Sequence, residues 1–137
     1  MEERGLDMEK ELLKKGPVLD EKGRPIPGYS RKSTLVYDRK AIKAPAWRIK
    51  EWDFYQISNE RLCLQFTIGH AAYAGQVSLM LFDFIKGEKL LDLNKILVLP
   101  FGSLHMPTDA EKDNTLSYEK GGVLMRFQTK NQKRVLT

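Results

Sequence analysis

The sequence predicts an all-β, mainly antiparallel fold, built as a barrel or as one half of a β-sandwich. From Ser33 onward, apolar residues alternate with polar ones at a period of two, as they do along half-buried strands. Clusters of glycine, proline and asparagine divide these runs into about seven short segments. Consecutive short strands pair as a meander, so the sheet must close on itself, pack on a second sheet or leave an edge open.

Residues 1–32 are predicted to form a lead-in with one short helix, followed by a basic, extended stretch. The helix is expected over 7–15, DMEKELLKK, with Asp7 as its N-cap and with Gly16 and Pro17 ending it. A helix this short is marginal alone and must dock on another element. The prolines and glycines of 20–28 predict turns.

The antiparallel domain is expected over 33–137, with its first strand at 33–37 and a proline interruption before the next. Residues 47–66 hold two tryptophans, two phenylalanines and one tyrosine. Within this stretch the alternation predicts a hairpin of strands 52–58 and 61–68. Its first strand carries Trp52, Phe54 and Gln56 on one face and Asp53, Tyr55 and Ile57 on the other.

Three further segments complete the domain. Residues 75–85 are apolar on both faces, which predicts a strand that is covered on both sides. The period of 90–99 is ambiguous, and β-branched residues favour a strand at 95–99. A final hairpin is expected from 115–119 and 123–129 across Gly121 and Gly122, with Val123, Met125 and Phe127 inside. The pattern at the end of the chain predicts the start of a new strand, so we expect the natural protein to continue.

Composition excludes several classes of protein. The single cysteine, Cys63, excludes an internal disulfide, which fits a reducing cytoplasm. The charged N-terminus lacks the apolar core of a secretory signal, and no apolar run reaches the ~20 residues that cross a bilayer. His70, His105 and Cys63 lack the converging neighbours of a metal site or an activated thiol. We therefore expect a cytoplasmic protein with no metal site and no cofactor.

Positive charge is concentrated in one segment. Residues 22–50 hold nine basic residues and one acidic residue, while the rest of the chain is neutral or acidic. This pattern suits an anionic surface such as a membrane or nucleic acid, or a solvated loop that balances acids elsewhere. The charges lack the dense runs of a nucleic-acid arm, which argues against nucleic acid as a partner.

Few residues suggest chemistry. Glu51 and Asp53 share a strand face, where two carboxylates can separate their pKa values for acid-base work, or can pair with Arg48, Lys50 or Arg61. His70 and Tyr73 lie between two strands, at the expected mouth of a barrel. The catalytic candidates are Glu51, Asp53, His70 and Tyr73. The candidates for ligand contact are Lys50, Trp52, Tyr55 and Tyr73.

Several short motifs resemble the bacterial domain-of-unknown-function family 2804. They are LDEKG at 19–23, Gly28-Tyr29, Tyr37-Asp38, Ile42-Lys43, RIKEWD at 48–53, and Tyr73 with Gly75. The resemblance implies the N-terminal part of a longer protein whose missing half is a partner of this chain. It also implies a distant similarity to lipocalin- or calycin-like double-barrel proteins such as tocopherol cyclase and hydroxyneurosporene synthase.

Three functions remain open at this point. The first is binding of a hydrophobic or amphipathic small molecule, such as a lipid. The second is an isoprenoid cyclase- or hydratase-like reaction that protonates an alkene, with further catalytic groups in the missing half. The third is binding of an anionic surface through 22–50. An open β edge would also favour homo-oligomers.

Overall fold

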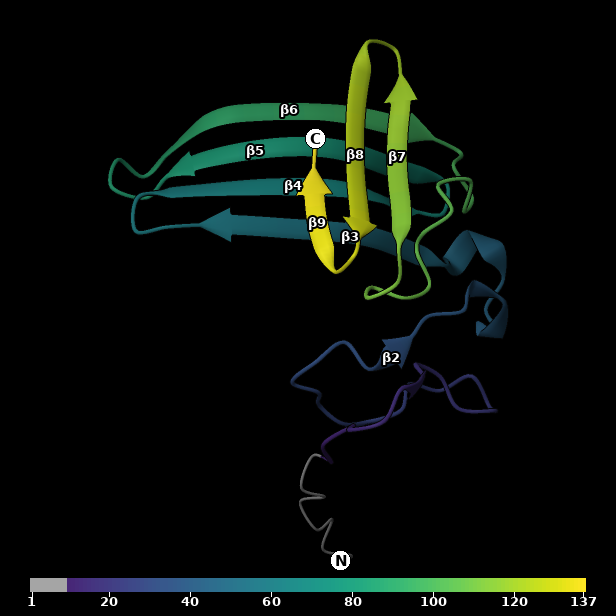
Figure 1. Cartoon of the computed structure of the whole chain (residues 1–137). Helices are drawn as coiled ribbons and strands as arrows, with labels where there is room; N and C mark the ends of the chain where they lie inside the picture. The colour runs from purple at the N-terminus through teal and green to yellow at the C-terminus, as the bar shows by residue number, and fades with distance from the viewer. Residues whose placement is uncertain (1–9) are drawn as a thin grey trace, which may run out of the picture.

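The computed structural model describes residues 10–137 and consists mainly of antiparallel β-sheet, as the sequence predicts (Figure 1). The larger sheet has the order β3-β4-β5-β6, and the smaller one has the order β7-β8-β9. Figure 1 shows the smaller sheet lying across one face of the larger sheet, with its strands at a steep angle. Within the described residues the sheets stay separate and close no barrel. The strands are β3 (Lys50–Ser58), β4 (Leu62–Ala71), β5 (Ala74–Asp83), β6 (Glu88–Val98), β7 (Asn114–Lys120), β8 (Val123–Lys130) and β9 (Lys133–Leu136).

Both predicted hairpins are confirmed. β3 and β4 are joined at Asn59, whose side-chain oxygen accepts hydrogen bonds from the backbone N–H groups of Arg61 (2.9 Å) and Leu62 (2.7 Å). β7 and β8 are joined by Gly121 and Gly122, which have φ angles of 61° and 77°. Positive φ at both central residues is the conformation of a type I′ turn, and its twist matches that of the flanking strands.

One face of the larger sheet, which we call the covered face, packs against the smaller sheet. The central side chain is Phe127 of β8, which meets the rings of Tyr55 (4.9 Å between centroids) and Phe66 (6.3 Å) edge to face. As predicted, Met125 and Phe127 are buried on the inner side of β8, and Val123 packs beside them. The buried core consists of Ile68, Val77, Leu97, Leu116, Met125 and Phe127.

The opposite face of the larger sheet, which we call the open face, has no second layer in the part of the chain that the structure describes. The sequence predicts a second layer over both faces of 75–85, and the structure shows one over the covered face alone. Met80 and Phe82 of β5 are half-buried on the open face, and Phe84, just beyond the strand, is exposed. The doubly apolar pattern identified the strand correctly but not what lies over its second face.

The helix predicted over 7–15 is wrong where it can be checked. Residues 7–9 lie outside the described residues, and 10–15 form no helix. Leu12 N–H donates to the carbonyl of Tyr29 (2.8 Å), and Tyr29 N–H donates to that of Lys10 (3.1 Å). Pairing with a distant segment satisfies this backbone better than a helix too short to be stable alone.

The remaining lead-in runs beside the sheets as two-residue strands, β1 (Gly16–Pro17) and β2 (Leu35–Val36), and two 3-10 turns, η1 (Arg39–Ala41) and η2 (Ala46–Arg48). It is fastened to the loop before β7, because Lys15 pairs with Asp109 (2.6 Å) and Tyr37 N–H donates to the carbonyl of Thr108 (2.8 Å). β6 extends over the whole of 88–98, further than the predicted 95–99, and the residues after the β8 turn form β9.

Candidate functional site

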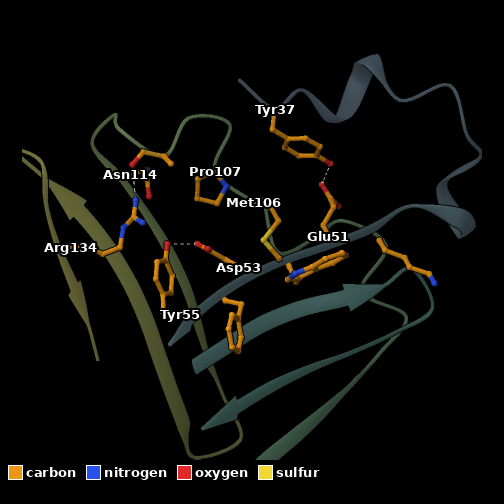
Figure 2. Close-up of a pocket in the computed structure, with 12 residues that line it drawn as sticks. Tyr37, Glu51, Asp53, Tyr55, Met106, Pro107, Asn114 and Arg134 are labelled. Atoms are coloured by element: carbon orange, nitrogen blue, oxygen red, sulfur yellow. Dashed lines mark hydrogen bonds between the residues drawn. The ribbon is translucent and has the colours of Figure 1, made fainter. Parts of the chain in front are cut away.

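A cleft of about 480 Å³, which we call the edge cleft, lies between the outer edge of β3 and the segment that leads into β7 (Figure 2). The β3 wall is formed by consecutive residues from Lys50 to Tyr55. The opposite wall is formed by Tyr37, Met106, Pro107, Ala110, Asn114 and Arg134. The cleft therefore combines apolar walls with several polar groups, as small-molecule and peptide sites commonly do.

Asp53 and Tyr55 form the polar centre of this cleft. The Tyr55 hydroxyl donates a hydrogen bond to Oδ2 of Asp53 (2.9 Å), and Figure 2 shows the two side chains pointing toward each other. Burial raises the pKa of the Asp53 carboxyl above its usual value. Burial and the neighbouring Asp53 charge raise the pKa of Tyr55 to about 12. Tyr55 thus stays a hydroxyl donor, and Asp53 is a carboxylate that gains from a further donor or cation.

Arg134 closes the far end of the cleft. Its guanidinium carbon lies 5.0 Å from the centroid of the Tyr55 ring, within cation–π range. Its Nη2 donates to the carbonyl of Ala110 (2.7 Å), and its Nε donates to the hydroxyl of Thr129 (3.0 Å). These two bonds hold the guanidinium in place and use two of its five N–H donors.

A buried polar cluster lies behind the cleft, centred on Glu51, which is 7% exposed. Its carboxylate accepts hydrogen bonds from the Tyr37 hydroxyl and from the Arg39 guanidinium. His70, its register partner on β4, lies 2.9 Å away through Nε2. Because the Ala72 N–H donates to Nδ1 of His70 (3.0 Å), we assign the proton to Nε2, which donates to Glu51. Burial, followed by the Arg39 charge, lowers the pKa of His70, so the ring is neutral.

Two glycines make room for this cluster. Gly75 lies opposite His70 in the sheet, and a Cβ there would come 2.8 Å from Cβ of His70. Gly102, with φ of 85°, lies over Arg39, and a Cβ there would come 2.7 Å from the guanidinium carbon. Arg39 in turn joins η1 to the sheet through Glu51. The cluster thus fixes the lead-in against β3 and supplies the back of the cleft.

The open face carries a second hollow, a trough of about 580 Å³. The strand register explains its shape. Across the sheet, Trp52 lies in a row with Gly69, Gln76 and Ile96, and the next row runs from Lys50 through Ala71 and Ala74 to Val98. The outer strands β3 and β6 thus carry large side chains, and the inner strands contribute the small residues Gly69, Ala71 and Ala74 together with Gln76. The residues that line the trough are Lys50, Trp52, Phe54, Thr67, Gly69, His70, Ala71, Ala74, Gly75, Gln76 and Ile96.

The structure brings most of the predicted site residues together. Lys50, Glu51, Trp52, Asp53 and Tyr55 all line the edge cleft, and His70 reaches it through Glu51. Tyr73 is different, because its side chain is 63% exposed in the β4–β5 turn and lines neither hollow.

Glu51 and Asp53 share a face as predicted, but their basic neighbours are Arg39 and Arg134 rather than Arg48, Lys50 or Arg61. Sequence reasoning missed these two arginines, as well as Tyr37, Met106 and Ile96. Tyr37 belongs to the Tyr37-Asp38 motif, but no local pattern gives any of these residues a role at the site, because their relevance comes from contacts across distant segments.

A comparison with protein families decides the relationship of this chain. The family described as Domain of unknown function (DUF2804) matches residues 9–137. The chain belongs to this family. No curated protein and no solved structure matches this DUF2804 member.

Two features are absent from residues 10–137 of the DUF2804 chain, the part that the structure describes. No helix there is long and apolar enough to cross a membrane. No group of three or more histidine, cysteine, aspartate or glutamate side chains in that range is arranged to hold a metal ion.

Proposed function

We propose that this protein binds an amphipathic small molecule, with an apolar body and a negatively charged end, in the trough on its open face. The observation that carries the proposal is the row arrangement of the sheet. Trp52 and Phe54 form one wall and Ile96 forms the other. The floor between them is low because β4 and β5 contribute Gly69, Ala71 and Ala74 there, beside Gln76. Trp52 is 66% exposed and Ile96 is 62% exposed. Apolar walls exposed around a ligand-sized hollow are typical of binding sites.

Charge supports a negatively charged end. Lys50 is the one charged residue among those that line the trough, because the neighbouring His70 is neutral. Thr67 and Gln76 add hydrogen-bonding groups on the floor. A carboxylate or phosphate at the Lys50 end, followed by an alkyl chain between the walls, satisfies all these groups.

Quenching of tryptophan fluorescence by a brominated fatty acid tests the proposal. The chain has two tryptophans, Trp52 in the trough and Trp47 on η2 outside it. We expect saturable quenching that persists in Trp47→Phe and disappears in Trp52→Phe. Absent or non-saturable quenching, or quenching that follows Trp47, would refute the proposal. A brominated phospholipid in vesicles distinguishes a lipid headgroup from a free acid as the preferred form.

Matched variants localise the site further. Ile96→Asp should abolish binding, whereas Leu124→Asp, at an exposed position on the outer side of β8, should leave it unchanged. Lys50→Gln should weaken binding of the anionic probe by roughly tenfold, the loss of one charge-assisted contact, and Lys130→Gln should have no effect.

The other two functions have less support. An alkene-protonating reaction needs a carboxylic acid beside a bound alkene, but Glu51 is ion-paired with Arg39, and Tyr73 is exposed and lines neither hollow. Three of the nine bases in 22–50, Arg24, Arg31 and Arg39, pair with Asp20, Glu11 and Glu51, which reduces the positive charge that can meet an anionic surface. The distant likeness to lipocalin-like double-barrel proteins also stays a proposal, and the antiparallel sheet with a ligand-sized trough is what supports it.

A further inference from the structure

The edge cleft has an unusual lining. Side chains of a strand alternate between its two faces, so a hollow on one face is lined by every second residue. The edge cleft is instead lined by six consecutive residues, Lys50 to Tyr55. A hollow with this lining must run along the side of the strand, where its backbone N–H and C=O groups emerge.

β3 is an edge strand, and β4 is its one partner among the described strands. Half of its backbone groups therefore point away from the sheet, toward the cleft. No backbone hydrogen bond in the described part of the chain reaches Lys50 to Tyr55 from that side. Met106 and Pro107 lie across the gap, and Pro107 has no N–H with which to pair to the strand.

We propose that the edge cleft binds an extended peptide, which adds to β3 as a further strand and places a lysine or arginine side chain against Asp53. The free edge dictates an extended backbone, because strand addition satisfies its unpaired donors and acceptors together. Asp53 selects the side chain. It accepts a bond from Tyr55, but no basic group of the described chain lies within ion-pairing distance, and Arg134 is held by Ala110 and Thr129.

A second copy of this chain fits the edge less well. Two β3 strands related by a two-fold axis would pair antiparallel, with residues of the same face opposite each other. A register centred on Trp52 sets Glu51 opposite Asp53, and registers centred on Glu51 or Asp53 set a carboxylate opposite itself. Like charges in direct opposition destabilise a strand pair. A basic peptide brings the complementary charge instead.

Amide NMR of the whole chain tests this proposal. The probe is a capped six-residue peptide of alternating threonine and valine with one central lysine. We expect shift changes centred on the amides of Lys50 to Tyr55, together with slower hydrogen exchange there. An N-methylated version lacks the backbone donors and should not bind. A peptide with glutamine in place of the lysine should bind the parent protein roughly tenfold more weakly. The Asp53→Asn variant should bind the lysine peptide more weakly by the same factor. Asp92→Asn, on β6, should bind like the parent protein.

Several results would overturn the proposal. One is the absence of any shift change at about 1 mM peptide, the weak limit of specific binding. Another is equal binding of the N-methylated peptide. A third is shift changes centred on Gly69, Gln76 and Ile96, which line the trough but not the edge cleft. A dimer in native mass spectrometry that persists whichever peptide is added would assign the β3 edge to a second copy of the chain. The brominated fatty acid assay with Asp53→Asn keeps the two sites separate, because that variant should retain trough binding.

Discussion

The two faces of the larger sheet use similar amino acids for different purposes. On the covered face, Tyr55 and Phe66 pack around Phe127 of the smaller sheet. On the open face, Trp52 and Phe54 of the same strand β3 stand exposed beside the trough. One residue of displacement along β3 thus separates a side chain that stabilises the fold from one that is free to meet a ligand. Whether an aromatic residue of β3 is buried therefore depends on the face of the sheet from which it projects, and not on which aromatic residue it is.

The largest expected effect comes from truncating the covered face. Phe127→Ala removes the ring at the centre of the core and should lower the free energy of unfolding by about 3–5 kcal/mol. Phe54→Ala removes the same ring from the open face and should cost below about 1 kcal/mol. Chemical denaturation of both variants measures the difference. Equal losses would mean that Phe54 is buried as deeply as Phe127.

The next effect concerns the polar cluster at the end of the covered face. Glu51→Gln leaves the Arg39 guanidinium without its carboxylate and should destabilise the protein by about 2–3 kcal/mol. The double variant Glu51→Gln with Arg39→Met removes both charges and should recover part of that loss. Denaturation of the single and double variants gives the coupling. Strict additivity would show that the ion pair contributes nothing specific.

A smaller effect is expected from pH. Because burial lowers the pKa of His70, the unfolded chain takes up its proton at a higher pH than the native protein does. The contribution of neutral His70 to the free energy of unfolding is therefore fully present above the pKa of the unfolded chain, about 6.5. It is lost as the pH falls from there toward the pKa of the native protein. Thermal unfolding across this range should show the loss in the parent protein and a weaker pH dependence in His70→Gln. An unchanged profile in the variant would assign the dependence to other groups.

Substitutions on the open face should have the smallest effect on stability. Their effect on ligand binding should be the largest. Ile96→Ser should change the free energy of unfolding by within about 0.5 kcal/mol, because its side chain is already largely exposed. It should nevertheless weaken binding of the brominated fatty acid clearly. Parallel denaturation and quenching measurements separate the two. A variant that lost stability in proportion to binding would place Ile96 in the core instead.

Prediction from sequence succeeded where local chemistry decides the structure. The Asn59 turn and the Gly121-Gly122 turn fix the two hairpins, and alternation fixes which β3 residues share a face. It failed at 10–15, where a distant backbone partner, Tyr29, outweighs local helix preference. Among site residues, the RIKEWD stretch provided one wall of the edge cleft. Arg134 and Pro107 of the other wall carry no local signal of their role.

The sequence by itself determined the antiparallel β class, the hairpins and the face on which each β3 side chain lies, because these follow from nearest-neighbour geometry and turn residues. The tertiary structure decided the rest. It set the four-strand register that aligns Trp52, Gly69, Gln76 and Ile96 into a trough, and it brought Arg39 and His70 to Glu51. Such contacts join residues far apart in the chain, and their pairing is selected by the packing of the whole sheet rather than by any local pattern.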